Sequence, residues 1–414
     1  MMPVNLRREA ARHDELLRRR LDEIVPMLMR REGIDCWIVA GREYAEDPVL
    51  LTMLPSMWLS GRRRTVLIWF DDGSTHERFA VSRYPVASLF SAVWHPETMP
   101  GQWSSLAALV GEHDPEKVAV GMSSTFPLAD GLTASEYTAL IDALGPMADR
   151  VVSGERLAVG WLETRLPDER ETFAEACQVA HDILRRGLSS AAITPNQTTN
   201  EDLEWWYRQT VHDAGLESWF HPTVAIQRRD GTGRTSFADS PQNVTIAGGD
   251  LVHVDFGIVW KGLCTDQQEH LYVLDSGESS PPRGLVDGMT VGNRMQDLLM
   301  AEFAAGRTGN EILASSLAAA EGESIDALVY THALGLHGHA AGPTIGLWDQ
   351  QEGVPGPGDY PLFANTGHSI ELSVAVAIPE WDDQSVRIML EQDAWFDGEA
   401  CTFLDGRQEE LWVM

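Results

Sequence analysis

The sequence of 414 residues lacks the features that mark several classes of protein. Its four cysteines are scattered and form no C-x-x-C pair, which argues against a disulfide scaffold and against a cysteine zinc site. Arginines interrupt the N-terminal segment, so it holds no apolar core of a signal peptide, and no hydrophobic run reaches the length of a membrane span. We therefore expect a cytoplasmic protein with no membrane partner.

Positive charge is also scarce. The chain has 31 Lys and Arg residues against 62 Asp and Glu residues, which gives a formal net charge of −31. Such a surface repels phosphates, so we expect no nucleic-acid partner. The length favours more than one domain, and the 43% share of hydrophobic residues is ordinary for a globular enzyme.

Residues 1–158 are predicted to form an α/β domain. An amphipathic helix is expected from Asn5 to about Arg31, with Gly33 ending it, and short runs rich in β-branched residues follow. The segment has no G-x-G-x-x-G motif after a strand, no P-loop and no G-x-S-x-G motif. We therefore assign it no catalysis of its own.

Residues 251–274 have the pattern of a β-hairpin. If the strands pair symmetrically about the midpoint between Trp260 and Lys261, Asp255 and Asp266 lie directly opposite each other, with Cβ atoms about 5 Å apart. Two carboxylates at that distance repel unless a proton or a cation lies between them. The pair therefore suggests one or two divalent metal ions, the alternative being that one Asp faces water at a strand end.

A glycine-rich segment over residues 330–349 carries three histidines, His332, His337 and His339. Its glycines allow the backbone to approach a site closely, and histidine is both a metal ligand and an acid–base group. The alternative is that the three histidines form a surface cluster whose hydrogen bonds are satisfied without a metal.

A second strand pair is predicted over residues 366–396. Glu371 and Glu391 are equidistant from Trp381, so a hairpin would oppose them as well. Each lies in an apolar run, where an uncompensated charge is costly. Metal ligation accounts for all four acids and a histidine together.

On these motifs the sequence resembles the pita-bread metallohydrolases, a family that includes methionine aminopeptidase, aminopeptidase P, prolidase and creatinase. The resemblance covers the chain from about Glu163 to the end, and in outline the first half too. It implies an α/β N-terminal domain over residues 1–158, an α+β pita-bread catalytic domain over residues 159–414, and a homodimer.

The resemblance also implies two divalent metal ions and a set of ligands for them. The ligands matched motif by motif are Asp255, Asp266, His339 in Gly338-His339-Ala340-Ala341-Gly342, Glu371 and Glu391. One nitrogen and many carboxylate oxygens suit Mn²⁺, with Zn²⁺, Co²⁺ or Fe²⁺ as possible alternatives.

The chain departs from the family pattern at two positions. No histidine precedes the first Asp motif within residues 236–250, and Gly346 stands seven places after His339, where the peptidases of the family tend to have a histidine. In those enzymes such histidines hold the substrate carbonyl or move a proton. His332, His337 or His221 could take these roles from elsewhere.

The predicted mechanism is attack of a metal-bridging water, made acidic by the cations, on a carbonyl polarised by one metal. Glu371 is the candidate that takes the proton of the water. His332 is the candidate that steadies the oxyanion, and His337, on the same side of an extended segment as His339, could contact the substrate.

The predicted substrate is a small peptide with proline after the scissile bond, cleaved by a Xaa-Pro aminopeptidase or dipeptidase. A tertiary X-Pro amide has no N–H and a fixed ring, so a shaped apolar site suits it. Four aromatic residues could wall that site or pack in the core: Trp219, Phe220, Trp348 and Trp381. The alternatives are a creatinase-like non-peptidase hydrolase or lyase acting on a small molecule, and an inactive binding protein.

Overall fold

The computed structural model describes residues 5–99, 101–235 and 243–414. The chain divides into two compact units, Met1–Thr164 and Arg165–Met414. In the described part of the chain, no helix has both the length and the apolar character needed to cross a membrane.

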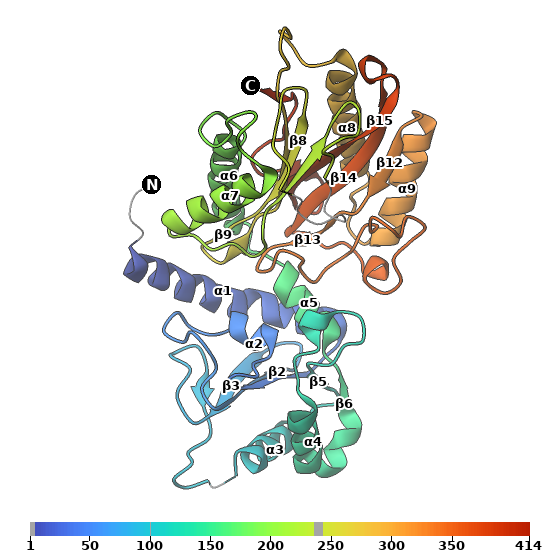
Figure 1. Cartoon of the computed structure of the whole chain (residues 1–414). Coiled ribbons are helices and arrows are strands. Elements are labelled where there is room, and N and C mark those ends of the chain that lie inside the picture. Colours follow the sequence, from blue (N-terminus) through green and yellow to red (C-terminus); the bar gives the residue numbers. More distant parts are fainter. Residues whose placement is uncertain (1–4, 100, 236–242) are drawn as a thin grey trace. The chain divides into compact units, whose positions relative to one another are not determined.

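The first unit contains a six-stranded mixed sheet with helices packed on it (Figure 1). Its strands are β1 (Cys36–Arg42), β2 (Arg64–Asp71), β3 (His76–Ser82), β4 (Ser91–Ala92), β5 (Val118–Val120) and β6 (Val151–Ser153). Its α-helices are α1 (Leu6–Glu32), α2 (Pro48–Thr52), α3 (Gln102–His113), α4 (Ala134–Leu144) and α5 (Glu155–Glu163). The strand order is β4-β3-β2-β1-β5-β6, antiparallel among β1, β2 and β3 and parallel elsewhere.

Local sequence signals explain the long first helix. The side chain of Asn5 accepts a hydrogen bond from the backbone N–H of Arg8 and caps the helix start. At the other end Gly33 adopts a left-handed conformation with φ 63°, which a residue without a Cβ takes at little cost. The predicted helix and its glycine end are thus confirmed.

The second unit contains a larger, mainly antiparallel sheet. Its strands are β7 (Thr223–Gln227), β8 (Leu251–Phe256), β11 (Gln267–Tyr272), β12 (Asp326–Val329), β13 (His332–Leu334), β14 (Thr366–Ile378), β15 (Gln384–Phe396), β16 (Cys401–Phe403) and β17 (Trp412–Val413), with the short pair β9 (Val259–Trp260) and β10 (Leu263–Cys264) beside it. The order of hydrogen-bonded neighbours across the sheet is β12-β14-β15-β11-β8-β7, and β13 pairs with β14.

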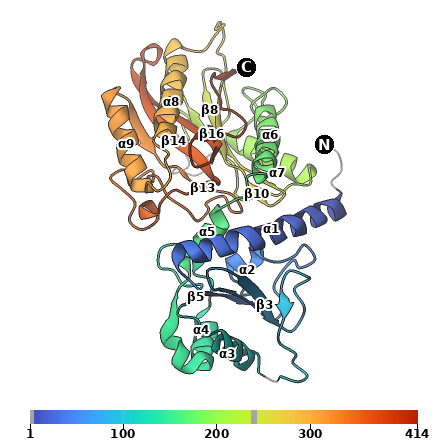
Figure 2. The same ribbon diagram turned by 180° about the vertical axis from the view of Figure 1, so that it is seen from behind.

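Two helix pairs cover this sheet: α6 (Glu169–Gly187) with α7 (Asn200–Asp213), and α8 (Arg283–Ala301) with α9 (Gly309–Gly322). Figures 1 and 2 show α6 and α7 beside β8, and α8 and α9 beside β14. One core joins α6 and α7 to β7 and β8, and another joins α8 and α9 to β14 and β15. Burial of these apolar stripes holds the second unit together.

Side chains alternate between the two faces of the sheet. In β14, Leu372 packs in the core with α8 and α9, so its neighbour Glu371 points to the opposite face. In β8, Val254 packs in the core with α6 and α7, so Asp255 also points away from its helix pair. The strand pattern thus brings acids from both halves of the sheet to one face.

The predicted pairing of the first hairpin is wrong by two residues. Asp255 lies opposite Gln268, not opposite Asp266. The turn consists of Lys261 and Gly262, which both have positive φ, at 51° and 81°, and Trp260 pairs with Leu263. The midpoint lies between Lys261 and Gly262, one residue later than predicted, because the lysine occupies a left-handed conformation that its side chain gives no reason to expect.

The second hairpin has the predicted pairing. Glu371 lies directly opposite Glu391 in the antiparallel pair of β14 and β15. The strands are joined at Pro379–Trp381, a short 3-10 turn, followed by two residues with positive φ. Trp381 is 4% exposed and belongs to the core with α8 and α9, so it does not wall a substrate site.

Candidate metal centre

Four carboxylates meet on one face of the large sheet. Asp255 belongs to β8, Asp266 directly precedes β11, and Glu371 and Glu391 belong to β14 and β15. Ligand atoms of Asp255, Asp266 and Glu391 all lie within 4.8 Å of one another. The aspartates therefore meet in space although they are not opposed in the hairpin.

The electrostatics of this cluster are unfavourable without a cation. Burial raises the pKa of Asp266 well above its ordinary value, and the nearby charge of Glu391 raises it further. Burial and Glu391 likewise raise the pKa of Asp255 and of Glu371. Because the charge of Glu391 raises the pKa of the other three buried acids, four ionised carboxylates can coexist here only with compensating positive charge.

Buried polar atoms without hydrogen-bond partners indicate where that positive charge would lie. Oδ1 of Asp255 and Oδ1 of Asp266 are buried without a hydrogen-bond partner, and so is Nε2 of His332. Buried polar atoms of this kind are rare in folded proteins unless a ligand or ion completes them. Oxygen-rich sites with an imidazole nitrogen suit a divalent cation, so the residues present fit a metal.

His332 is the histidine most closely surrounded by these acids. It lies in β13, beside Ser369 of β14. Its Nε2 is 3.5 Å from Oε1 of Glu391, 3.6 Å from Oδ2 of Asp266 and 4.0 Å from Oε2 of Glu371. Its Nδ1 lies 3.0 Å from the carbonyl oxygen of Ala333, which can only accept, so Nδ1 donates this hydrogen bond and Nε2 is the nitrogen that faces the acids.

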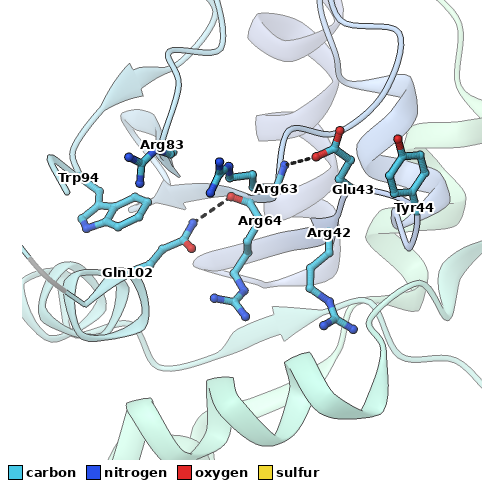
Figure 3. A pocket seen from close by; sticks show the side chains of 8 residues that line it. All are labelled: Arg42, Glu43, Tyr44, Arg63, Arg64, Arg83, Trp94 and Gln102. Atoms are coloured by element: carbon cyan, nitrogen blue, oxygen red, sulfur yellow. Dashed lines mark hydrogen bonds between the residues drawn. The ribbon is translucent and has the colours of Figure 1, made fainter.

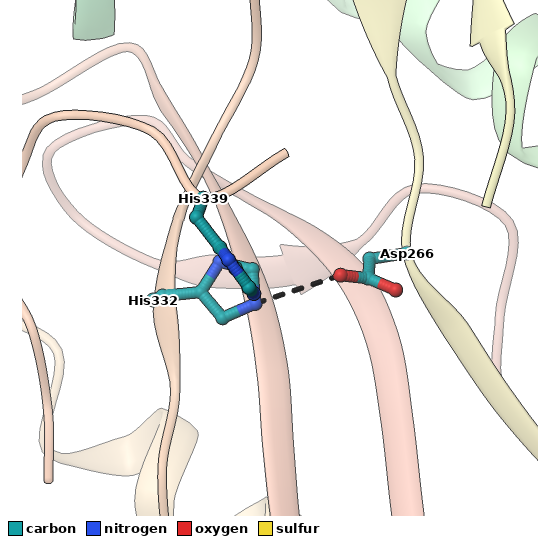
Figure 4. A group of neighbouring side chains, drawn as sticks. All are labelled: Asp266, His332 and His339. Atoms are coloured by element: carbon teal, nitrogen blue, oxygen red, sulfur yellow. Dashed lines mark ion pairs between the residues drawn. The ribbon is translucent and has the colours of Figure 1, made fainter. Parts of the chain in front are cut away.

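His339 lies next to His332, and both rings lie near Asp266 (Figure 4). Ligand atoms of Asp266, His332 and His339 lie within 4.8 Å of one another. The His339 ring is exposed and packs edge-on against His332 and against Trp219, with ring centroids 4.9 and 5.3 Å apart. His339 therefore reaches the site at its solvent side.

The other two histidines with predicted roles lie outside these groups. Among the described residues, the groups close enough to share a metal do not include His337, whose pKa burial lowers and whose Nδ1 has no partner. His221 lies 3.6 Å from Glu204 of α7 and packs against the ring of Trp205. The segment 236–250, which lacks a histidine, lies partly outside the described residues.

Sequence reasoning missed two buried residues that support the acids. Gln268 donates hydrogen bonds to both Glu371 and Glu391, and His253 contacts the oxygen of the same amide. A signal for them existed, because His253 stands two residues before Asp255 and Gln268 two after Asp266, and residues two apart in a strand share a face.

A separate hollow of about 530 Å³ in the first unit has a different chemistry (Figure 3). It is lined by Arg42, Glu43, Tyr44, Arg63, Arg64, Arg83, Trp94 and Gln102. Arg42 and Arg64 both pair with the buried carboxylate of Glu136. The lining has one carboxylate and no histidine or cysteine, so it lacks the ligands of a hydrolytic metal site.

Comparison with known proteins identifies the class of the second unit. The model of "Metallopeptidase family M24" matches residues 171–392, more than half of the chain and the segment that holds all the acids described above. The chain belongs to this family of metallopeptidases, whose members use divalent metal ions. The predicted pita-bread fold and family are thereby confirmed. No curated protein matches the chain.

Solved structures show the same two-part fold. An X-Pro aminopeptidase from Thermotoga maritima MSB8 is 16% identical and matches 94% of this chain and 100% of that chain, with a TM-score of 0.64. An Xaa-Pro dipeptidase from Bacillus anthracis is 20% identical over 98% of this chain and 100% of that chain, with a TM-score of 0.60. The dipeptidase PepE from Mycobacterium ulcerans is 16% identical over 97% and 98%, with a TM-score of 0.65.

Proposed function

We propose that this metallopeptidase removes a residue that precedes proline from small peptides. The observation that carries the proposal is the convergence of four carboxylates and the bare Nε2 of His332 on one spot of a peptidase fold. The solved structures described as X-Pro aminopeptidase and Xaa-Pro dipeptidase support the substrate class by analogy. A homodimer and a cytoplasmic location remain predictions from the sequence.

The proposed metal ligands are Asp255, Asp266, Glu371 and Glu391, with one histidine. The sequence motif favours His339, but the distances favour His332, whose Nε2 lies within 4.0 Å of three of the acids. Spacing supports this revision. Counted from His332, the seventh residue is His339, so the second histidine expected seven places after the ligand is present.

The donor set suggests the identity and number of the metals. Four carboxylates and one imidazole suit two divalent ions, with Mn²⁺ preferred and Zn²⁺, Co²⁺ or Fe²⁺ as alternatives. When bound, such ions would polarise the substrate carbonyl and lower the pKa of a water molecule.

Glu371 is proposed as the proton acceptor. Its side chain is 18% exposed, whereas that of Glu391 is 1% exposed. Oε2 of Glu371 is the oxygen nearer to His332, while Oε1 is engaged by Gln268. Glu371 can therefore receive a proton and pass it to the departing amine, whereas Glu391 is too enclosed to exchange with solvent.

His339 takes the role first predicted for His332, that of steadying the oxygen of the substrate carbonyl. It is exposed beside the acids, where a substrate would enter, and Trp219 packs against its ring. His337 is kept as a possible substrate contact, since it lies in the same loop but outside the groups of ligand atoms.

Trp219 is the aromatic residue that we propose receives the proline ring. It packs on Phe220 with ring centroids 4.4 Å apart, and its Nε1 donates to the carbonyl of Thr265, next to Asp266. Trp348 is 72% exposed and Trp381 lies in the core. A rigid ring needs such a fixed apolar surface more than a flexible side chain does.

The test is hydrolysis of X-Pro dipeptides and X-Pro-Y tripeptides, with X-Ala peptides as matched controls, by metal-free protein reloaded with Mn²⁺, Zn²⁺ or Co²⁺. We expect cleavage of the proline peptides in at least one metal form. Bound metal without cleavage of any peptide would favour the creatinase-like alternative, which the missing histidine within residues 236–250 supports. Failure to bind metal would leave only a binding protein.

A further inference from the structure

Gln268 occupies a special position among the acids. In the sheet it is the direct partner of Asp255 in β8 on one side and of Glu391 in β15 on the other. Its side chain is buried, with the residue 3% exposed. A neutral amide thus lies in the middle of four groups that are ionised when a metal is bound.

Both N–H groups of this amide are directed at glutamates. Nε2 of Gln268 lies 2.6 Å from Oε1 of Glu371 and 2.7 Å from Oε2 of Glu391. The remaining oxygens, Oε2 of Glu371 and Oε1 of Glu391, are those that approach Nε2 of His332. Each glutamate therefore has one oxygen turned toward Gln268 and one toward the unpaired atoms of the site, and the latter oxygen of Glu391 also accepts a hydrogen bond from the hydroxyl of Ser369.

His253 fixes which way the amide faces. Its Nε2 lies 2.8 Å from Oε1 of Gln268, an oxygen that can only accept, so His253 donates this hydrogen bond. His253 is 5% exposed and packs beside His270, with ring centroids 4.9 Å apart. Rotation of the amide would turn its oxygen toward two carboxylates and leave the N–H of His253 without an acceptor.

We propose that Gln268, oriented by His253, is a positioning residue that assigns one oxygen of Glu371 and one of Glu391 to the metal ions. The inference rests on the proposed metal centre and adds to it a pair of supporting residues. Outer hydrogen bonds of this kind hold a ligand in its binding rotamer, so the site loses less conformational entropy when metal binds.

The first test is calorimetric titration of Mn²⁺ into the metal-free full chain. Gln268→Met keeps the length of the side chain and removes both N–H donors, so we expect Mn²⁺ to bind about 10- to 100-fold more weakly. Gln392→Met is the matched control: Gln392 is also buried in the sheet, next to Glu391, but its amide contacts His181 and the backbone carbonyl of Gln268, and in the described part of the chain it has no hydrogen bond to the side chains of the four acids. The control should keep the wild-type affinity.

Gln268→Asn is a second variant that keeps the inference testable if Gln268→Met does not fold. It keeps the amide but is one methylene shorter, so it cannot bridge both glutamates, and it too should weaken Mn²⁺ binding. Cooperative thermal unfolding of the metal-free variants checks that they fold. Wild-type Mn²⁺ affinity in a folded Gln268→Met or Gln268→Asn protein would overturn the inference.

A double-mutant cycle tests the role of His253. His253→Leu should weaken Mn²⁺ binding in the wild-type background and have no further effect in Gln268→Met, because His253 acts through the amide. His253→Gln, which keeps an N–H donor, should restore part of the affinity. An equal loss from His253→Leu in both backgrounds would refute the proposed link.

Gln268→Glu separates positioning from direct ligation. If Gln268 supports the glutamates through its N–H groups, a fifth carboxylate there repels them and weakens Mn²⁺ binding. Tighter binding would mean that position 268 faces the metal itself, against the inference. If the wild-type chain binds no Mn²⁺, both the proposed function and this inference are refuted. If the wild type binds Mn²⁺ and folded Gln268→Met binds it with the same affinity, only this inference is refuted.

Discussion

Nε2 of His332 lies 3.5 Å from Oε1 of Glu391, and that nitrogen has no hydrogen-bond partner in the described residues. The opposite nitrogen of the ring is engaged by the carbonyl of Ala333. A metal cation between this nitrogen and the carboxylate would bind both of them.

The first prediction follows from that pair. His332→Ala should weaken Mn²⁺ binding by more than about 100-fold, the largest loss expected from removing a residue that only supports a ligand. His339→Ala should keep most of its metal and lose turnover. Metal content per chain after mild purification, together with calorimetric titration, measures both. If His339→Ala loses the metal and His332→Ala keeps it, the motif-based assignment of His339 as the ligand is the right one.

The second prediction separates the two opposed glutamates. Glu371→Gln should lower kcat by about 100- to 10,000-fold, the usual range for loss of a general base, because the amide cannot take a proton. Glu391→Gln should mainly weaken Mn²⁺ binding, since Glu391 is enclosed. Turnover is compared at saturating metal, with Glu380→Gln at the exposed turn as control. Full turnover in Glu371→Gln would leave Glu371 a purely structural ligand.

Much of the fold could be predicted from alternation and symmetry. The pairing of Glu371 with Glu391 was predictable because the loop between β14 and β15 is symmetric about Trp381. The pairing of the first hairpin was not predictable, because its register depends on Lys261 adopting a left-handed conformation. A two-residue shift in register changes the partner of Asp255 from Asp266 to Gln268, and only the folded backbone decides between them.

The choice of histidine could not be made from one motif. His332 and His339 both lie in glycine-containing surroundings, and the short strand that presents His332 to the acids exists only because it pairs with β14. The seven-residue spacing between the two histidines was visible in the sequence and is the signal that could have identified His332. The support from His253 and Gln268 depends on contacts between three strands, which sequence periodicity does not supply.

The third prediction concerns acid sensitivity. Burial lowers the pKa of His368 to about 3, and its Nε2 lies 2.8 Å from the hydroxyl of Thr366. Since the pKa is about 6.5 in the unfolded chain, the unfolded state binds the extra proton between these values. The stability that His368 contributes is therefore complete above about pH 6.5 and is lost as the pH falls toward 3.

Urea unfolding at pH 7 and pH 5 measures this effect. His368→Leu should reduce the loss of unfolding free energy between the two pH values by about 2 kcal/mol relative to wild type. Phe303→Leu, which alters the ring packed against His368 but removes no titrating group, should change the stability without changing its pH dependence. An unaltered pH dependence in His368→Leu would show that His368 is protonated to the same extent in both states.

The last prediction concerns the proline ring. Trp219 lies between His339 and Phe220, and its ring fits over Gly338, where a Cβ would come within 2.4 Å of the indole. If the substrate ring packs on Trp219, its removal costs part of the about 1.5 to 3 kcal/mol gained by burying an apolar side chain, or about tenfold in KM.

Trp219→Ala should therefore raise KM for X-Pro dipeptides more than for X-Ala dipeptides, if the latter are cleaved at all. Trp219→Phe should have a KM for X-Pro dipeptides between those of the wild type and Trp219→Ala, because it keeps an apolar ring but loses the hydrogen bond to Thr265. Trp348→Ala is the control, since Trp348 is 72% exposed. Unchanged KM values for the proline peptides in folded, metal-loaded Trp219→Ala would move the ring-binding surface elsewhere, and an equal rise for both peptide series would assign Trp219 to general support of the site.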